Sequence, residues 1–208
     1  MHGLVIPHTM DELSAIGTPG AVKGNMEALE YELYDTQLYT SAGTTQLTFF
    51  TAADVNNALV TNMRAAGQLP NPDFFAPRVV TLDVITDEPG DFPRLRDLYR
   101  LLYGTTATQA PFSSFSYAGK EYCHYSLASI GAMGGPTGFS TRTAVEYANN
   151  GAIGRGRSMG IGADGDPSIL ILPLQAFRWV LTWPAAVTLT ANVSLRLSMH
   201  GTYYRQIR

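Results

Sequence analysis

The residues most suggestive of chemistry lie between positions 154 and 165, in the stretch GRGRSMGIGADG. Within it, Gly156, Ser158 and Gly160 fit G-x-S-x-G, the nucleophile elbow of serine hydrolases. Residues 160–165 also fit G-x-G-x-x-G, the fingerprint of dinucleotide-binding folds. Each pattern forms its site only between particular flanking elements, so the neighbouring residues decide whether either chemistry is available.

A nucleophile elbow needs a buried strand before the serine and a helix after it, because the strained turn between them exposes the hydroxyl. The residues before Ser158 have no strand pattern, and the glycine-rich residues 160–167 cannot start a helix. Asp164 or Asp166 followed by His200 would match the hydrolase order, but these acids lie only a few residues from the serine. His200 also falls on the polar side of a predicted strand. We therefore predict no catalytic role for Ser158.

Neither a dinucleotide site nor a metal site is predicted at this loop. The dinucleotide fingerprint must open a helix, whose N-terminus meets the pyrophosphate, and here a predicted strand follows instead. Asp164 and Asp166 lack the third acid and the closing Glu of an EF-hand, so they are expected to be solvated.

A second group, Glu121, Cys123 and His124, combines residue types that bind metals. Adjacent side chains of a strand point to opposite faces, so at most Glu121 and Cys123 are expected to share a side. Cys123 is the only cysteine, which excludes an intrachain disulfide. The sequence thus predicts no catalytic residue, no cofactor and no metal ion, and the protein is not expected to be an enzyme.

Composition restricts the partners of the chain. Charged residues make up 15% of the 208 residues, against about 25% in typical soluble domains. The net charge of −3 predicts no general attraction to nucleic acid, and no sequence-specific nucleic-acid partner is expected. Low charge indicates instead that part of the surface is covered by neighbouring subunits. No run of about 18 apolar residues is present, so no membrane-spanning helix is predicted.

Strand patterns dominate the elements that must position these residues. From Val187 to Met199 every odd position is apolar and every even position is polar, which is the alternation of a half-buried strand. A strand of that length is unusual, so a bend or a break is expected near Ala191-Asn192. Including this segment, the strand candidates number about eight; the others are residues 29–40, 44–51, 78–86, 112–118, 121–130, 168–174 and 176–184.

Helices are predicted only as short insertions. The clearest spans residues 90–104, with Asp91 as a cap, Pro93 in the first turn and Gly104 at the stop. Weaker helical patterns occur at residues 52–67 and 141–150. Regular strand–helix alternation is missing, which favours an all-β antiparallel sandwich or barrel over a doubly wound sheet.

The expected organisation is an N-terminal arm followed by one domain. Residues 1–27 contain four glycines, two prolines and one short helical signal, and are interpreted as the arm. Residues 28–208 are expected to form a single domain with a long glycine-rich loop at about residues 131–167. The arm carries apolar residues without a core-forming pattern, so it is predicted to dock on a neighbouring subunit or on an internal membrane.

The C-terminal half resembles the closing strands of jelly-roll capsid proteins from tailless icosahedral bacteriophages, whose barrels stand vertically. The features that carry the resemblance are aromatic residues in a strand, a proline-marked loop, and a last strand with a glycine and a basic residue; they are Phe177, Trp179, Trp183, Pro184, Gly201 and Arg205. The stretches TTQLTFF (44–50) and TNMRAAGQLPNPDFF (61–75) resemble the first strands and connecting turn of such a protein. Together these segments cover most of residues 29–205.

This resemblance implies an antiparallel eight-stranded jelly roll and a structural role in the virion. The subunit would be made in the host cytoplasm and would assemble with identical subunits, as trimers or hexameric capsomers, and with other capsid proteins. The alternative is a jelly-roll carbohydrate-binding module or a hydrolase with Ser158 as nucleophile. Either alternative needs convergent polar groups in the mouth of the barrel.

Overall fold

The computed structural model describes residues 26–53, 60–86, 95–105, 110–130, 137–140, 146–149, 157–159 and 169–206. Its strands and helices are, in order, β1 (Met26–Tyr39), β2 (Gln46–Phe49), β3 (Phe74–Thr86), α2 (Leu95–Tyr103), β4 (Phe112–Tyr117), β5 (Lys120–Ser126), α3 (Leu127–Ile130), β6 (Thr137–Ser140), β7 (Glu146–Asn149), β8 (Arg157–Ser158), β9 (Phe177–Thr182) and β10 (Val193–Gln206). The described part of the chain is mainly antiparallel β-structure, as predicted from the sequence.

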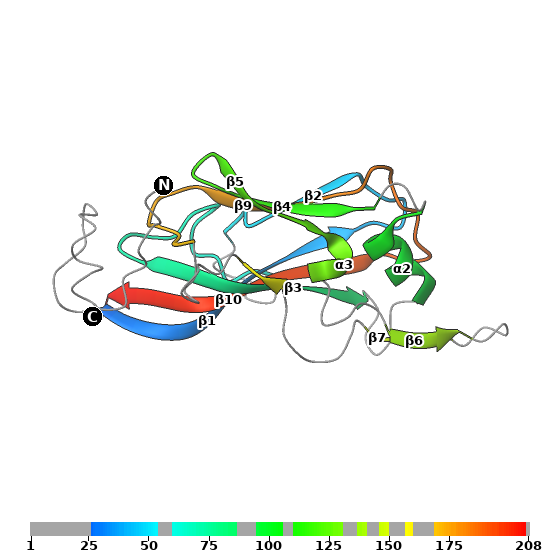
Figure 1. Ribbon diagram of the computed structural model, residues 1–208, viewed down its shortest axis with the longest axis horizontal. Helices are drawn as coiled ribbons and strands as arrows, with labels where there is room; N and C mark the ends of the chain where they lie inside the picture. Colours follow the sequence, from blue (N-terminus) through cyan, green and yellow to red (C-terminus); the bar gives the residue numbers. More distant parts are fainter. Residues whose placement is uncertain are drawn as a thin grey trace.

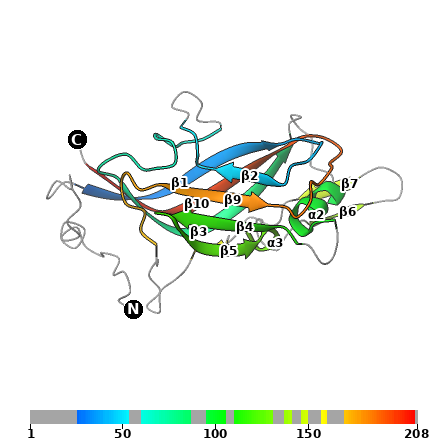
Figure 2. The ribbon, with the colours of Figure 1, turned by 90° about the horizontal axis from the view of Figure 1, so that it is seen from above.

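Two four-stranded sheets form the two layers of the molecule (Figure 1). Sheet A has the order β1-β10-β3-β8, and sheet B has the order β2-β9-β4-β5. Every pairing between these strands is antiparallel. Figure 2 shows sheet B lying over sheet A, with α2 and α3 at one end and the short hairpin β6-β7 beside them.

Strand β10 confirms the register predicted from period-two alternation. The side chains of Val193, Leu195, Leu197 and Met199 are all buried on the side that faces sheet B. Because β10 lies between β1 and β3, this row is covered by strands on both sides as well as by the opposite sheet. Ser198, on the other face, is also buried, which alternation did not predict.

One connected group of buried side chains fills the space between the sheets. It contains aromatic residues from sheet B, such as Phe49, Phe115 and Trp179, and aliphatic residues from sheet A, such as Leu82 and Leu197. Alternate residues of each strand reach this layer because successive side chains of a strand point to opposite faces. Hydrophobic alternation is therefore what brings the two sheets together.

Helix α2 closes one end of the sandwich, and its prediction is confirmed over the described residues. Leu98, Leu101 and Leu102 are buried on one face. The helix ends at Gly104, which has a φ of 83° and donates its amide to the Arg100 carbonyl at 2.9 Å. Left-handed glycine is the common way to stop a helix, since it carries no Cβ. The predicted cap and first-turn proline lie outside the described residues.

The two weaker helix predictions are wrong where the structure describes them. Residues 60–67 of the expected helix at 52–67 are not helical, and Asn62 in this segment bonds the backbone of β1 instead. Glu146–Asn149, inside the second expected helix, forms β7 and pairs with β6. In both places pairing with another segment outweighs a weak local preference for helix.

Three strand predictions are only partly right. Residues 127–130 form α3 rather than the end of a strand. The described part of residues 168–174 makes two backbone bonds between Ile171 and Phe75 and one from Leu174 to Leu69, instead of forming a full strand. Residues 187–192 are not a strand either, so the expected break falls directly before β10.

The segment before β10 is irregular because other groups take its backbone bonds. The Val187 amide donates to the Tyr39 hydroxyl at 3.0 Å, and the Thr190 amide donates to Asp97 Oδ2 at 2.9 Å. Val187 is nevertheless buried, as the alternation predicted. In this segment the apolar pattern still decides which side chains are buried. The backbone does not pair as a strand, because side-chain oxygens accept its amide hydrogens.

The expected arm and the long loop are only marginally described. Strand β1 begins at Met26, and residues 1–25 lie outside the described residues. Within the expected loop at 131–167, the structure describes β6, β7, β8 and Met159. In the described part of the chain, no helix has both the length and the apolar character needed to cross a membrane.

Candidate functional site at the mouth of the sandwich

Ser158, the candidate nucleophile, lies in the short edge strand β8 and not at a strand-to-helix turn. The pattern before Ser158 suggested no strand, but Arg157 and Ser158 pair with Val80 and Val79 of β3. Its carbonyl accepts a hydrogen bond from the Tyr125 hydroxyl at 3.0 Å, and its own hydroxyl is buried without a hydrogen-bond partner. Buried in this way, Oγ has no access to a substrate.

His200 is not a partner of Ser158. Val79 of β3 pairs with Ser158 on one side and with His200 on the other, so a whole strand separates the two residues. Neighbouring strands lie about 4.8 Å apart, which places the two side chains about 10 Å from each other. His200 Nε2 instead lies 3.3 Å from the Thr81 hydroxyl. Asp164 and Asp166 lie outside the described residues.

At the Glu121–His124 group the structure corrects the predicted faces. His124 Nδ1 lies 2.9 Å from Glu121 Oε1, and both side chains are exposed. Cys123 is buried on the opposite face, where burial raises the pKa of its thiol. A β-bulge between β4 and β5 inserts one residue at Tyr122 and so reverses the alternation. Within the described ranges, no three His, Cys, Asp or Glu side chains gather as metal ligands.

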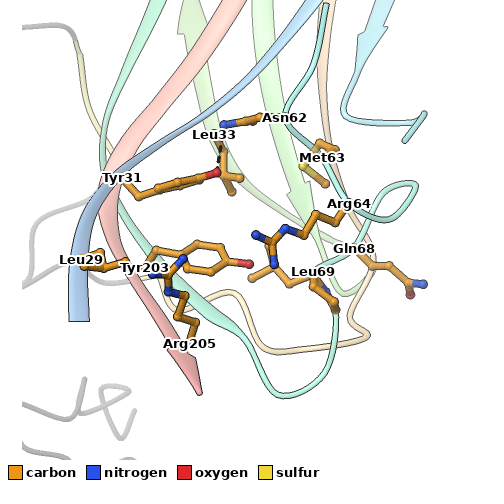
Figure 3. A pocket seen from close by; sticks show the side chains of 11 residues that line it. Leu29, Tyr31, Leu33, Asn62, Met63, Arg64, Gln68, Leu69, Tyr203 and Arg205 are labelled. Carbon is orange, nitrogen blue, oxygen red and sulfur yellow. Dashed lines mark hydrogen bonds between the residues drawn. The ribbon is translucent and has the colours of Figure 1, made fainter. Parts of the chain in front are cut away.

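Polar side chains do converge at the other end of the sandwich, opposite α2. There the start of β1 and the end of β10 meet residues 60–73, which connect β2 to β3 (Figures 1 and 3). A cavity of about 40 Å³ lies between these segments. Its lining residues come from the core-facing side of both strands and from the connection; they are Leu29, Tyr31, Leu33, Asn62, Met63, Arg64, Gln68, Leu69, Pro70, Tyr203 and Arg205.

Two tyrosines form the inner wall of this cavity. The rings of Tyr31 and Tyr203 lie with centroids 4.9 Å apart, one on β1 and the other on β10 (Figure 3). The Tyr203 hydroxyl donates to Asp73 Oδ2 at 2.7 Å, and both residues are buried. Burial, followed by the adjacent carboxylate, raises the pKa of Tyr203, so this hydroxyl stays a proton donor at neutral pH. The hydrogen bond between Tyr203 and Asp73 holds the connection between β2 and β3 against the end of β10.

Asn62 fastens the other end of the connection to β1. Its Oδ1 accepts the Tyr34 amide at 2.9 Å, and its Nδ2 donates to the Glu32 carbonyl at 2.6 Å. These bonds occupy the free edge of β1 as a neighbouring strand would. Nδ2 also lies 3.5 Å from the Tyr31 hydroxyl, the dashed contact in Figure 3.

Outside the cavity lies an open groove of about 700 Å³ with charges of both signs. Arg64 and Arg205 line both spaces. Arg205 of β10 forms an ion pair with Glu27 of the neighbouring strand β1. The Glu27 carboxylate raises the pKa of the Arg205 guanidinium further. Asp73 completes the charged wall of the groove.

The size of the inner cavity limits what it can hold. A volume of about 40 Å³ accommodates a few water molecules, whereas pockets for small ligands span roughly 300–1,000 Å³. The outer groove has the volume of a ligand pocket but is open. Behind it Tyr203 is buried, with its ring tilted against the ring of Tyr31. No exposed aromatic platform for a sugar ring is present among the described groove residues.

Sequence reasoning missed Asn62, Arg64, Asp73 and Tyr203. The first two lie in a segment interpreted as a helix, and the third follows the turn-rich Pro70–Pro72. No local pattern marks these residues, because their arrangement depends on β1 and β10, which are far apart along the chain. No protein-family model, curated protein or solved structure matches this chain.

Proposed function

We propose that this protein is a structural coat subunit with a jelly-roll fold, which assembles with copies of itself into the shell of a tailless icosahedral bacteriophage. The order of strands in the two sheets is the observation that carries the proposal. Leaving aside the hairpin β6-β7, sheet A joins the first, eighth, third and sixth strands, and sheet B joins the second, seventh, fourth and fifth. Two Greek keys wound together produce this order, and double-sheet jelly rolls of this kind are common in viral capsid domains.

The same architecture also occurs in lectin and cupin domains. The mouth of the sandwich, which is the end opposite α2, therefore helps to decide between a coat subunit and a ligand-binding domain. A binding module or hydrolase would present convergent polar groups in an accessible pocket there. The inner cavity is water-sized, and the hydroxyl of Tyr203, which lines it, is already hydrogen-bonded to buried Asp73. Ser158, the nucleophile of the hydrolase alternative, lies in an edge strand with its hydroxyl buried. These features favour a scaffold over a ligand-binding site.

Low charge and exposed apolar residues support assembly. The six large hydrophobic side chains that are exposed among the described residues are Leu38, Ile85, Tyr99, Tyr103, Tyr122 and Leu174. Obligate protein interfaces are large and more apolar than ordinary surface. The proposed partners are identical subunits, in trimers or hexameric capsomers, and other capsid proteins of the virion.

The N-terminal residues are proposed to contribute contacts beyond the domain. Because β1 begins at Met26 next to the end of β10, a truncation before this residue leaves every pairing of sheet A intact. We expect a variant lacking residues 1–25 to fold normally and to assemble poorly. Circular dichroism checks the fold, and sedimentation checks the assembly; particles indistinguishable from those of the full chain would show that the arm is dispensable.

Direct imaging of the assembled protein tests the proposed function. Purified protein is examined by sedimentation velocity over a range of concentrations and by electron microscopy, with virion extract added in a parallel sample. Trimers, hexamers or shells are expected. A protein that stays monomeric in both samples, or that binds immobilised glycans selectively, would exclude the coat-subunit proposal.

A further inference from the structure

Helix α2 presents an unusual exposed face. Arg96, Tyr99, Arg100 and Tyr103 occupy positions i, i+3, i+4 and i+7, which share one side of a helix. Tyr99 and Tyr103 are 47% and 44% exposed, and their rings are already stacked with centroids 5.3 Å apart. Tyrosine and arginine are the residues most enriched at the energetic centres of interfaces. We call these four residues the α2 ridge.

A second unusual surface lies on the outer face of sheet A. Leu38 of β1 and Ile85 of β3 lie on either side of Ser194, in one row across the sheet. They are 48% and 40% exposed, at positions where alternation places polar residues. Both strands run toward the end of the molecule that carries α2 (Figures 1 and 2). We call Leu38 and Ile85 the outer row.

We propose that the α2 ridge of one copy of this chain docks on the outer row of the next copy. The inference rests on the proposed function, for which it names the contact between subunits. Both halves of the contact occur on one chain, at the same end of the molecule but on different surfaces. A contact between two different surfaces repeats from copy to copy, and it closes into a ring when the rotation between copies allows.

Charge favours contact between the α2 ridge and the outer row over contact between two ridges. The row next to the outer row contains Asp83 beside Arg196, and Glu32 lies two rows further along the same face, beside His200. Burial, followed by the carboxylate of Glu32, raises the pKa of Asp83, whereas Arg196 and His200 act in the opposite direction. Ridge against ridge would bring four guanidinium groups together. Ridge against outer row instead brings two arginines toward a face where the two carboxylates of Asp83 and Glu32 outnumber the single guanidinium of Arg196.

The test uses one variant for each surface, with matched controls. Tyr99→Ala/Tyr103→Ala removes the ridge rings, and Leu38→Thr/Ile85→Thr makes the outer row polar while keeping strand-forming residues. Arg96→Glu keeps both rings and reverses one ridge charge. The control Tyr122→Ala removes a tyrosine that is also 47% exposed but lies on sheet B. All changed side chains are at least 40% exposed or lie on the exposed helix face, and circular dichroism verifies each fold.

Sedimentation velocity then measures self-association. We expect each of the three surface variants to raise the dissociation constant at least about 30-fold, the effect of losing an interface hot spot. The control should stay within about threefold of the unaltered chain. A mixture of the ring-deleted variant and the outer-row variant should form dimers, because one intact ridge meets one intact row.

The outcomes separate this inference from the proposed function. An unaltered chain that stays monomeric overturns both. An unaltered chain that assembles, together with surface variants that assemble equally well, overturns the docking contact alone. Impaired variants whose mixture forms no dimer also overturn it, because the ridge would then bind some other surface.

Discussion

Replacing Leu195 by alanine tests the assignment of the core more directly than any other change. Leu195 is fully buried in the middle of β10, opposite Gln37 of β1 and Val84 of β3. Truncating a buried leucine removes transfer free energy and leaves a cavity, at a typical cost of about 2–5 kcal/mol. For a chain of this length that loss corresponds to a decrease in melting temperature of roughly 4–20 °C.

Ser198 provides the matched control on the same strand, three residues further along. Its side chain is 1% exposed and lies on the opposite face of sheet A, and its hydroxyl has no hydrogen-bond partner. Leaving a buried hydroxyl unpaired costs about 1–3 kcal/mol. Ser198→Ala removes that cost, so we expect the free energy of unfolding to stay the same or to increase.

Urea unfolding of the unassembled protein measures both changes. The comparison is made at concentrations where the chain is monomeric, because subunit contacts add apparent stability by mass action. A lower midpoint at unchanged slope is expected for Leu195→Ala, and an equal or higher midpoint for Ser198→Ala. Equal losses from the two changes, or a larger loss at Ser198, would refute the assigned register of β10.

Three further changes probe groups that the structure places in unusual surroundings. Tyr203→Phe removes the hydroxyl that bonds buried Asp73, and we expect a loss of about 1.5–3 kcal/mol in urea unfolding. Burial raises the pKa of Asp35, so the folded state holds this proton more strongly than the unfolded chain and stability falls as pH rises above the ordinary value of 3.8. Asp35→Asn should remove that part of the pH dependence. Ser158→Ala should leave fluorophosphonate labelling unchanged at background level.

Each of these three has its own control. Tyr204→Phe changes the neighbouring tyrosine, on the opposite face, and should be neutral; equal losses would show that the bond to Asp73 contributes nothing. For Asp35, the difference in unfolding free energy between the variant and the unaltered chain is followed with pH, and a difference that stays constant would contradict the raised pKa. Labelling abolished by Ser158→Ala would show that this serine is a nucleophile.

Local patterns were sufficient for the strongest elements. The register of β10 was predicted correctly because alternation over Val193–Met199 leaves only one way to bury its apolar side chains. Helix α2 was predicted because leucine spacing and Gly104 agree. In both cases every local preference pointed to the same structure, so no distant partner was needed to decide it.

Where distant partners decide the structure, local patterns were misleading. Residues 60–67 belong to a segment with helical spacing, but the Asn62 side chain forms hydrogen bonds with the backbone at the free edge of β1. The bulge at Tyr122 reversed the faces of Glu121 and Cys123, since one extra residue in a strand shifts every later side chain to the other side. Neither the edge nor the bulge is visible without the paired strand.

The sequence by itself determined that this is a mainly antiparallel β protein, because period-two alternation can be satisfied only by half-buried strands. Only the tertiary structure decided which strands are neighbours, and the neighbouring strands in turn decide which residues form the mouth of the sandwich and the outer row. The mouth of the sandwich joins Tyr31 and Asp73 to Tyr203, more than a hundred residues further along the chain, and the outer row joins Leu38 to Ile85 through Ser194. Such contacts depend on the order of strands, which hydrophobic alternation leaves open because it sets the face of each side chain and not its neighbour.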